Sequence, residues 1–391
     1  MKILVVTPTF FPIMGGAELG IYELFRRLSS KHEIKIFTPW PDKSLVEEYG
    51  MEKSEIDLNN IGVVRFNDRV NLKKWPDPWL LKGIIPPFSF SSIWSLRKLL
   101  KYYKPDIINV FYPLPMGLSA LYLEKIIKIP VVLSLVGRDV PGPNLPRFWS
   151  NYTRTITRLI SQKIFISDYC RKALFNTNTE EGIVIPFGID VDKYNPDIDG
   201  SSIRRKLSIP KEALVLFALQ RLDKWKRVDV IIKALKSVLK RKDVFLLIGG
   251  KGPENNYLNQ MTKDLGISSR VIFAGFIPEN ELPIYYATAD LFVFHSIYET
   301  LGLVLLQAMA SGKPIVSVES TAIPEVIDNH KNGILVEPLN PEQFADAIIY
   351  LLENKDIMKI FSQNSRKTAL EKYDWNYISK RYEEIFLKCI G

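Results

Sequence analysis

One stretch of the sequence, residues 295–314, combines an acid, a glycine and an apolar run (HSIYETLGLVLLQAMASGKP). It follows a predicted strand, and Gly302 opens a predicted helix. The amino end of a helix offers free backbone N–H groups and the positive end of its dipole, which together favour a bound phosphate. Glu299 lies in the loop, where it can face a sugar. The ordinary alternative is that Gly302 relieves crowding and Glu299 is a solvated loop acid.

A second group of charged residues, Arg221 and Lys226, follows another predicted strand. Cations in such a loop can make charge-assisted hydrogen bonds to an anionic group. A basic surface turn is the alternative, since Lys224 and Arg227 are charged too.

Two further segments belong to the first half of the sequence. Gly15 and Gly16 lie between the first predicted strand and a helix, and paired glycines let a backbone approach a ligand closely, although turn glycines are commonplace there. Arg138 and Asp139 follow the strand predicted at 131–135. Arg138 can meet either a phosphate or a surface acid.

These segments resemble glycosyltransferase family 4. The family's Glu-x7-Glu motif with its following Gly-Lys-Pro is matched by Glu299, Gln307 and residues 312–314, and its Gly-Arg-x4-Lys segment by Arg221 and Lys226. The resemblance implies that the first acid binds the donor sugar and that the second position binds the ribose hydroxyls. It also implies that Arg221 and Lys226 stabilise the negative charge on a departing diphosphate, more in the transition state than before it. Gln307 departs from the pattern, because an amide offers one acceptor and one donor where a carboxylate accepts twice.

The glycine loop and the segment 136–139 extend the resemblance, with Val136 in place of the histidine of the family's His-Gly-x-Asp. The implied catalytic residues are Glu299, Arg221, Lys226 and Asp139. Arg138 and Asp139 would lie on the acceptor side, where Asp139 would orient or deprotonate an acceptor hydroxyl. The implied donor contacts are Gly15, Gly16, Arg221, Lys226, Glu299, Thr300, Leu301, Gly302, Leu303 and Gln307.

The activity that the resemblance implies is hexosyl transfer with retained anomeric configuration. The donor would be a nucleotide diphosphate sugar, the acceptor a glycan or lipid, and no metal or other cofactor would be needed. A nucleotide-sugar epimerase or sugar phosphorylase on the same architecture is one alternative. A catalytically silent protein that binds sugar nucleotides or membranes is another, motivated by Gln307 and Val136.

The elements that must position these residues follow an α/β pattern, in which β-branched runs alternate with stretches of helical length. We predict two doubly wound, Rossmann-like domains facing across a cleft, the GT-B fold, with the site between them. Their ranges are 1–190, for the acceptor, and 191–374, for the nucleotide sugar. The hinge lies in 186–196, and helix 375–391 follows the second sheet or packs on the first domain. Strands are predicted at 3–6, 34–37, 63–66, 107–110, 131–135, 163–166, 183–185, 214–218, 245–248, 271–273, 291–294, 315–318 and 334–336.

Charge and composition limit the kinds of partner that the protein can have. A net charge of +9 favours an anionic partner, but zinc-finger spacing and RNA-binding motifs are lacking, so we expect no nucleic acid. Residues 71–104 mix tryptophans with many Lys and Arg, which suits either an anionic membrane surface or a core with a solvated helix face. Cys170 and Cys389 show no metal-type spacing, and no apolar run is long enough to span a membrane. We therefore expect a cytoplasmic protein, peripheral at the inner face of the membrane if it meets one.

Overall fold

The structure is a computed structural model that describes residues 1–13, 15–41, 58, 60–66, 86–137, 140, 147–176 and 180–391, with residues 86–91 described by their backbone alone. The chain divides into two compact units. The first comprises Met1–Phe187 together with Trp375–Gly391, and the second comprises Gly188–Asp374. The division thus falls between Phe187 and Gly188, inside the segment expected to be the hinge.

The first unit is built on a parallel sheet of seven strands. One of its interior strands, β1, continues after the exposed Lys2 as a run of apolar residues buried on both faces, as parallel sheets covered by helices require. The order is β3 (Ile61–Phe66), β2 (Glu33–Pro39), β1 (Lys2–Val6), β4 (Ile107–Phe111), β5 (Val131–Leu135), β6 (Gln162–Phe165) and β7 (Ile183–Val184).

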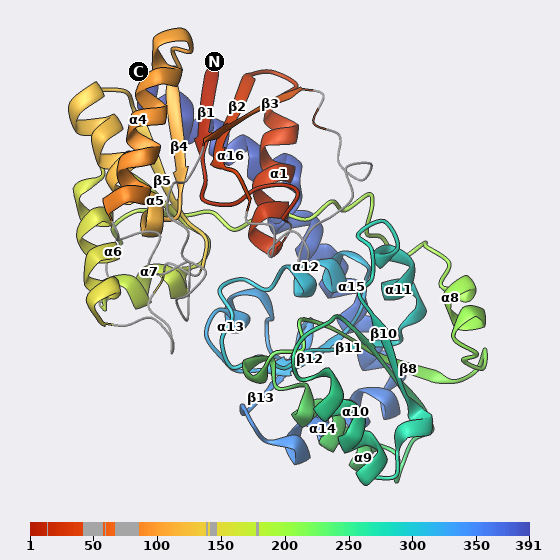
Figure 1. Cartoon of the computed structure of the whole chain (residues 1–391). Coiled ribbons are helices and arrows are strands. Elements are labelled where there is room, and N and C mark those ends of the chain that lie inside the picture. Colours follow the sequence, from red (N-terminus) through yellow and green to blue (C-terminus); the bar gives the residue numbers. More distant parts are fainter. Residues whose placement is uncertain are drawn as a thin grey trace. The chain divides into compact units, whose positions relative to one another are not determined.

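Helices cover both faces of this sheet (Figure 1). One face carries α1 (Gly16–Leu28) and α16 (Trp375–Ile390). The other carries α4 (Pro86–Tyr102), α5 (Pro113–Leu121) with the π-helical turn Tyr122–Ile127 that continues it, and α6 (Arg147–Leu159); the short helix α7 (Asp168–Phe175) follows β6.

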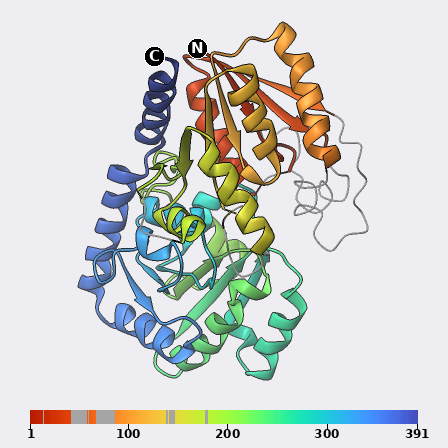
Figure 2. The ribbon, with the colours of Figure 1, turned by 90° about the vertical axis from the view of Figure 1, so that its left-hand side faces the viewer.

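Helix α16 joins the first unit although it ends the chain. Phe386 stacks on Phe25 of α1 with ring centroids 6.5 Å apart, and Trp375 packs against Phe187 at 6.0 Å. The two ends of the chain therefore lie at the same end of this unit (Figure 2). Glu383 of α16 accepts a 2.9 Å bond from the ring of His32, so a polar contact adds to the apolar packing.

The second unit repeats the architecture with a parallel sheet of six strands. The order is β10 (Val271–Gly275), β9 (Val244–Gly249), β8 (Leu214–Leu219), β11 (Leu291–Val293), β12 (Ile315–Val318) and β13 (Gly333–Val336). Its helices are α8 (Ser201–Lys206), α9 (Val228–Val238), α10 (Asn255–Asp264), α11 (Leu282–Thr288), α12 (Leu303–Ala310), α13 (Ile323–Val326), α14 (Pro341–Glu353) and α15 (Lys355–Lys372), with 3-10 turns at Lys224–Lys226 and Ser268–Arg270.

Both sheets reverse their strand order once, between β1 and β4 in the first unit and between β8 and β11 in the second. Ligands of open α/β sheets bind beyond the carboxyl ends of the strands at this reversal. The predicted α/β class with two doubly wound sheets is confirmed, and the loops after these four strands are where a site is expected.

Candidate active site

The reversal point of the second sheet gathers the charged residues that the sequence singled out. Arg221 and Lys226 follow β8, and Glu299 follows β11, the strand paired with β8. The two loops are joined by a 3.1 Å bond from the N–H of Ile297 to the carbonyl of Trp225. Parallel pairing brings the ends of β8 and β11 to one edge, so residues more than seventy positions apart in sequence meet here.

Lys226 and Glu299 form the central contact of this site. The Lys226 ammonium lies 2.6 Å from a carboxylate oxygen of Glu299, and both side chains are largely buried, at 17% and 16% exposed. The backbone of Glu299 is fixed as well, because its N–H donates to the Thr321 hydroxyl at 2.8 Å and its carbonyl accepts from the N–H of Ala322. The acid is therefore held by loops that follow three different strands.

Arg221 is oriented by its neighbour Asp223. Its Nε donates to one carboxylate oxygen at 2.7 Å and its Nη2 to the other at 3.1 Å, a paired geometry that fixes the plane of the guanidinium. Asp223 is buried, while Arg221 keeps 39% of its side chain exposed. A charged group that is both oriented and accessible is suited to an anionic ligand.

Gly302 shapes the start of α12. It adopts a left-handed backbone conformation with φ +83°, and a Cβ at this position would lie 2.9 Å from Leu305 and 3.4 Å from Glu299. The turn passes from Glu299 through Thr300 and Leu301 to the first helical residue, Leu303. The amino end of α12 thus begins four residues after the acid, where its backbone N–H groups and dipole favour an anion.

Gln307 lies deeper in the second unit than the other predicted site residues. Its side chain is 4% exposed, and both ends of its amide are bonded inside the protein. The carbonyl oxygen accepts from the Tyr286 hydroxyl at 3.0 Å, and the amide nitrogen donates to the Tyr194 hydroxyl at 3.0 Å. Both polar ends of the Gln307 side chain are thus bonded within the second unit.

Sequence reasoning missed Gln220 and Thr321. The Gln220 amide donates to the backbone carbonyl of Lys226 at 3.2 Å, which braces the turn that carries this lysine, and its buried carbonyl oxygen has no hydrogen-bond partner. An unpaired buried acceptor is costly and is a group that a ligand N–H or O–H would satisfy. The position of Gln220 directly before Arg221 was the available signal; Thr321, in a loop after β12, offered none.

The glycine loop of the first unit lies at the reversal point of the first sheet. Gly15 caps α1 and Gly16 is the first residue of that helix. The N–H of Gly15 donates to the Glu18 carboxylate at 3.0 Å, and the Thr9 hydroxyl donates to the same side chain. Glu18 therefore holds this loop closed onto the start of α1.

Arg138 and Asp139 lie outside the described residues. The two residues before them follow β5; Val136 is buried and Gly137 has φ 142°. Trp75, Trp79, Lys73, Lys74 and Lys82 of the basic aromatic segment also lie outside the described residues.

His295 is buried beside this site but belongs to the interior. Its Nε2 accepts a 3.1 Å bond from the N–H of Leu339, and burial, with a smaller contribution from Arg227, lowers its pKa to about 4. The ring is therefore neutral at physiological pH. Within the part of the chain that the structure describes, no group of three or more His, Cys, Asp or Glu side chains is arranged to hold a metal ion.

Two models of known protein families match this chain. The model of Glycosyltransferase Family 4 matches residues 14–193, and that of Glycosyl transferases group 1 matches residues 199–368. The two matches together span both units. The chain is a family 4 glycosyltransferase.

Two curated relatives align along nearly the whole of this glycosyltransferase. N-acetyl-alpha-D-glucosaminyl L-malate synthase of Bacillus anthracis is 26% identical, over 97% of this chain and 95% of the relative. Alpha-monoglucosyldiacylglycerol synthase of Streptococcus pneumoniae is 26% identical, over 100% of this chain and 86% of the relative. Anabaena Alr3699/HepE, solved with UDP, shares the fold with a TM-score of 0.79 at 22% identity, covering 99% of this chain and 100% of that one.

These matches make the protein a nucleotide-sugar glycosyltransferase of the GT-B type. None of the helices in the described ranges is both long enough and apolar enough to cross a membrane.

Proposed function

We propose that this enzyme transfers a hexose, with retained configuration, from a nucleotide diphosphate sugar to a glycan or lipid acceptor. The observation that carries the proposal is the Lys226–Glu299 pair at the reversal point of the second sheet, beside the oriented Arg221 and the start of α12. Two cations and a helix amino end suit a diphosphate, and the adjacent acid suits a sugar hydroxyl.

In the proposed reaction the bond between the sugar and the diphosphate breaks, and the diphosphate leaves with added negative charge. Arg221, Lys226 and the start of α12 stabilise that charge, while Glu299 accepts a hydrogen bond from the donor sugar and orients it. The acceptor hydroxyl attacks from the face that the diphosphate leaves, and a phosphate oxygen takes its proton. Since the protein's own cations neutralise the leaving group, we propose that the reaction needs no metal.

The test is a screen of UDP-, GDP- and ADP-sugars by thermal shift and by product analysis, with and without EDTA, and with mixed glycan and lipid acceptors. We expect one nucleotide to shift the unfolding temperature and to support transfer that EDTA does not abolish. Glu299→Gln should still fold and bind the nucleotide but lose transfer. Epimerised donor without acceptor, or binding without any turnover, would instead support the epimerase or the silent binding protein.

The acceptor side has a second observation in its favour, the exposed face of α4. Trp94 and Tyr102 are 68% and 91% exposed, and the exposed cations Arg97, Lys98 and Lys101 lie between them. The Lys98 ammonium lies 5.9 Å from the centre of the Trp94 ring. Such a mixture of aromatic and cationic side chains suits an anionic membrane surface, so we propose a lipid acceptor reached from the inner face of the membrane.

Flotation with vesicles tests this placement. We expect binding to vesicles that contain an anionic phospholipid and weaker binding to zwitterionic vesicles or at high salt. Replacing Lys98 and Lys101 by Gln should reduce binding, whereas replacing the exposed lysines Lys211 and Lys236 of the second unit should not. Equal binding by both variants, or indifference to anionic lipid, would remove the membrane proposal and leave the transfer reaction untouched.

A further inference from the structure

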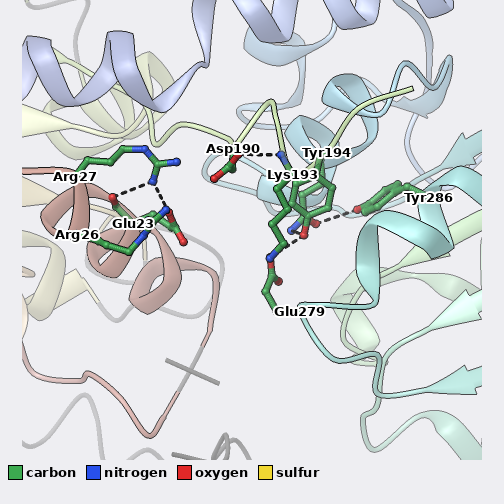
Figure 3. Close-up of polar contacts among 9 residues, drawn as sticks. Glu23, Arg26, Arg27, Asp190, Lys193, Tyr194, Glu279 and Tyr286 are labelled. Carbon is green, nitrogen blue, oxygen red and sulfur yellow. Dashed lines mark hydrogen bonds and ion pairs between the residues drawn. The ribbon is translucent and has the colours of Figure 1, made fainter. Parts of the chain in front are cut away.

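The amide of Gln307 belongs to a continuous series of hydrogen bonds inside the second unit, which we call the Gln307 network: Lys193, Tyr194, Glu279, Tyr286 and Gln307. The Tyr286 hydroxyl lies 3.0 Å from the Gln307 carbonyl oxygen and 3.0 Å from the backbone carbonyl of Val304. Gln307 donates to Tyr194, and Tyr194 donates to Glu279 at 2.7 Å. The Lys193 ammonium bonds the same Glu279 oxygen at 3.0 Å. Figure 3 shows Lys193 and Tyr194 reaching Glu279 from one stretch of chain, with Tyr286 close by.

With Glu279 as the final acceptor, an amide at position 307 gives the network a consistent direction. The Glu279 carboxylate only accepts, so it takes the single Tyr194 proton. The Tyr194 oxygen can then receive the N–H of Gln307, while the Gln307 carbonyl receives the Tyr286 hydroxyl. Burial, with a contribution from Glu279, raises the pKa of Tyr286 well above its ordinary value, which keeps that hydroxyl a donor.

A carboxylate at position 307 would break this match. It has no proton to give Tyr194, and it would compete with Glu279 for the one proton that Tyr194 carries. Two carboxylates would also share a site in which Lys193 bonds only the far one. The interior of this protein therefore accounts for Gln307 where the family motif has an acid.

The network connects α12 to elements distant in sequence. Tyr194 lies in the segment that opens the second unit, Tyr286 on α11, and Glu279 in the loop between β10 and α11. Arg366 of α15 adds a second tie, with its Nη1 between 2.8 and 2.9 Å from the carbonyls of Val191, Tyr194 and Ala310, the last residue of α12. Helix α12 is thus fixed from its middle and from its carboxyl end.

We propose that Gln307 is a positioning residue, which sets α12 and through it the loop of Glu299 and Gly302, and that it does not contact the donor ribose. Tyr194 is its partner in this role. The inference rests on the proposed donor site, because it is the amino end of α12 that the network would place against the diphosphate.

The test compares wild type with Gln307→Glu, Glu279→Gln and the double variant. For each protein, the dissociation constant of the nucleotide selected by the donor screen, the donor KM and the unfolding temperature without ligand are measured. We expect Gln307→Glu to weaken nucleotide binding about fivefold or more and to lower the unfolding temperature. Glu279→Gln should lose less, because its amide carbonyl still accepts the Tyr194 proton. The double variant should recover a large part of the loss, since Gln at 279 can donate to Tyr194 and Tyr194 can turn its proton to Glu at 307.

Three results would overturn the inference. Unchanged or tighter nucleotide binding by Gln307→Glu with an unchanged unfolding temperature would indicate a ribose contact. A lower unfolding temperature with unchanged binding would restrict Gln307 to stability. A double variant no better than Gln307→Glu would exclude the directed network. If wild type bound no nucleotide, the proposed function would fail, while the unfolding temperatures of the four proteins would still decide whether the network exists.

Discussion

Lys224 and Lys226 occupy the same 3-10 turn but have different surroundings. The ammonium of Lys226 meets Glu299 and lies 5.7 Å from the Phe294 ring, whereas Lys224 is exposed. A lysine stabilises the leaving diphosphate best when its ammonium group is held in the site. Replacing each lysine in turn therefore distinguishes the effect of a positioned cation from the effect of the protein's net charge.

Lys226→Met should lower kcat/KM by about tenfold to a hundredfold, the effect of losing one charge-assisted bond to the leaving group. Lys224→Met removes the same charge two residues away and should stay within about twofold, since a surface charge contributes little. Steady-state kinetics of both variants with the selected donor give the comparison. Equal losses would mean that the turn acts only through its overall charge.

His295 predicts a pH dependence of stability. Its folded pKa of about 4 lies below the ordinary 6.5, so the unfolded chain binds a proton that the folded protein excludes. Stability from this residue is present above pH 6.5 and is lost as the pH falls from 6.5 to about 4, by about 3 kcal/mol in total. Denaturant unfolding across this range should show a shallower acid slope in His295→Gln; an unchanged slope would assign the loss to other groups.

The residues of the site were only partly predictable from the sequence. Arg221, Lys226 and Glu299 were identifiable because they lie in loops after predicted strands, which reach one edge of a parallel sheet, and because they match family motifs. The bonds of Gln307 were not, because Tyr194 is 113 positions away and its contact depends on how the second unit packs. Buried polar pairing of this kind leaves no local pattern in the sequence.

The positions of the strands were more predictable from the sequence than the side-chain contacts were. All thirteen predicted strands are present, with their ends shifted by at most two residues, because most of them are β-branched or apolar runs buried within a parallel sheet. The π-helical turn Tyr122–Ile127 was not anticipated. An extra residue per turn produces no distinct pattern of apolar positions in so short a segment.

The start of helix α12 depends on the backbone conformation of a single residue, Gly302. Gly302→Ala should cost about 1–2 kcal/mol for the left-handed backbone and more for the contacts with Leu305 and Glu299, and it should weaken donor binding. Gly266→Ala is the control, because Gly266 has φ +70° with open space around it. Unfolding and nucleotide titrations of the two variants distinguish the backbone cost, which they share, from the displacement of α12. Equal effects on donor binding would argue against a role for the Gly302 turn.

At the scale of the whole molecule, the two units differ in how the chain builds them. The second is one continuous segment, Gly188–Asp374, whereas the first needs residues from both ends of the chain. Helix α16 covers Phe25 and Phe187, which are buried residues of the first unit.

Removing residues 375–391 should therefore destabilise the first unit and leave the second folded. Hydrogen exchange followed by mass spectrometry should show lost protection in β1, β4 and α1 but retained protection in β8 and β11. Removing only residues 388–391 is the control, because Phe386 remains. Uniform loss of protection in both units would show that they unfold as one.

The return of α16 to the first unit also bears on how the protein is made. Domains generally fold in the order in which the ribosome releases them. Here the second unit can complete its fold while the last residues are still being synthesised, whereas the sheet that begins the chain must wait, with Phe25 uncovered, until Trp375–Ile390 has emerged. The half of the enzyme that is translated first is the half that is finished last.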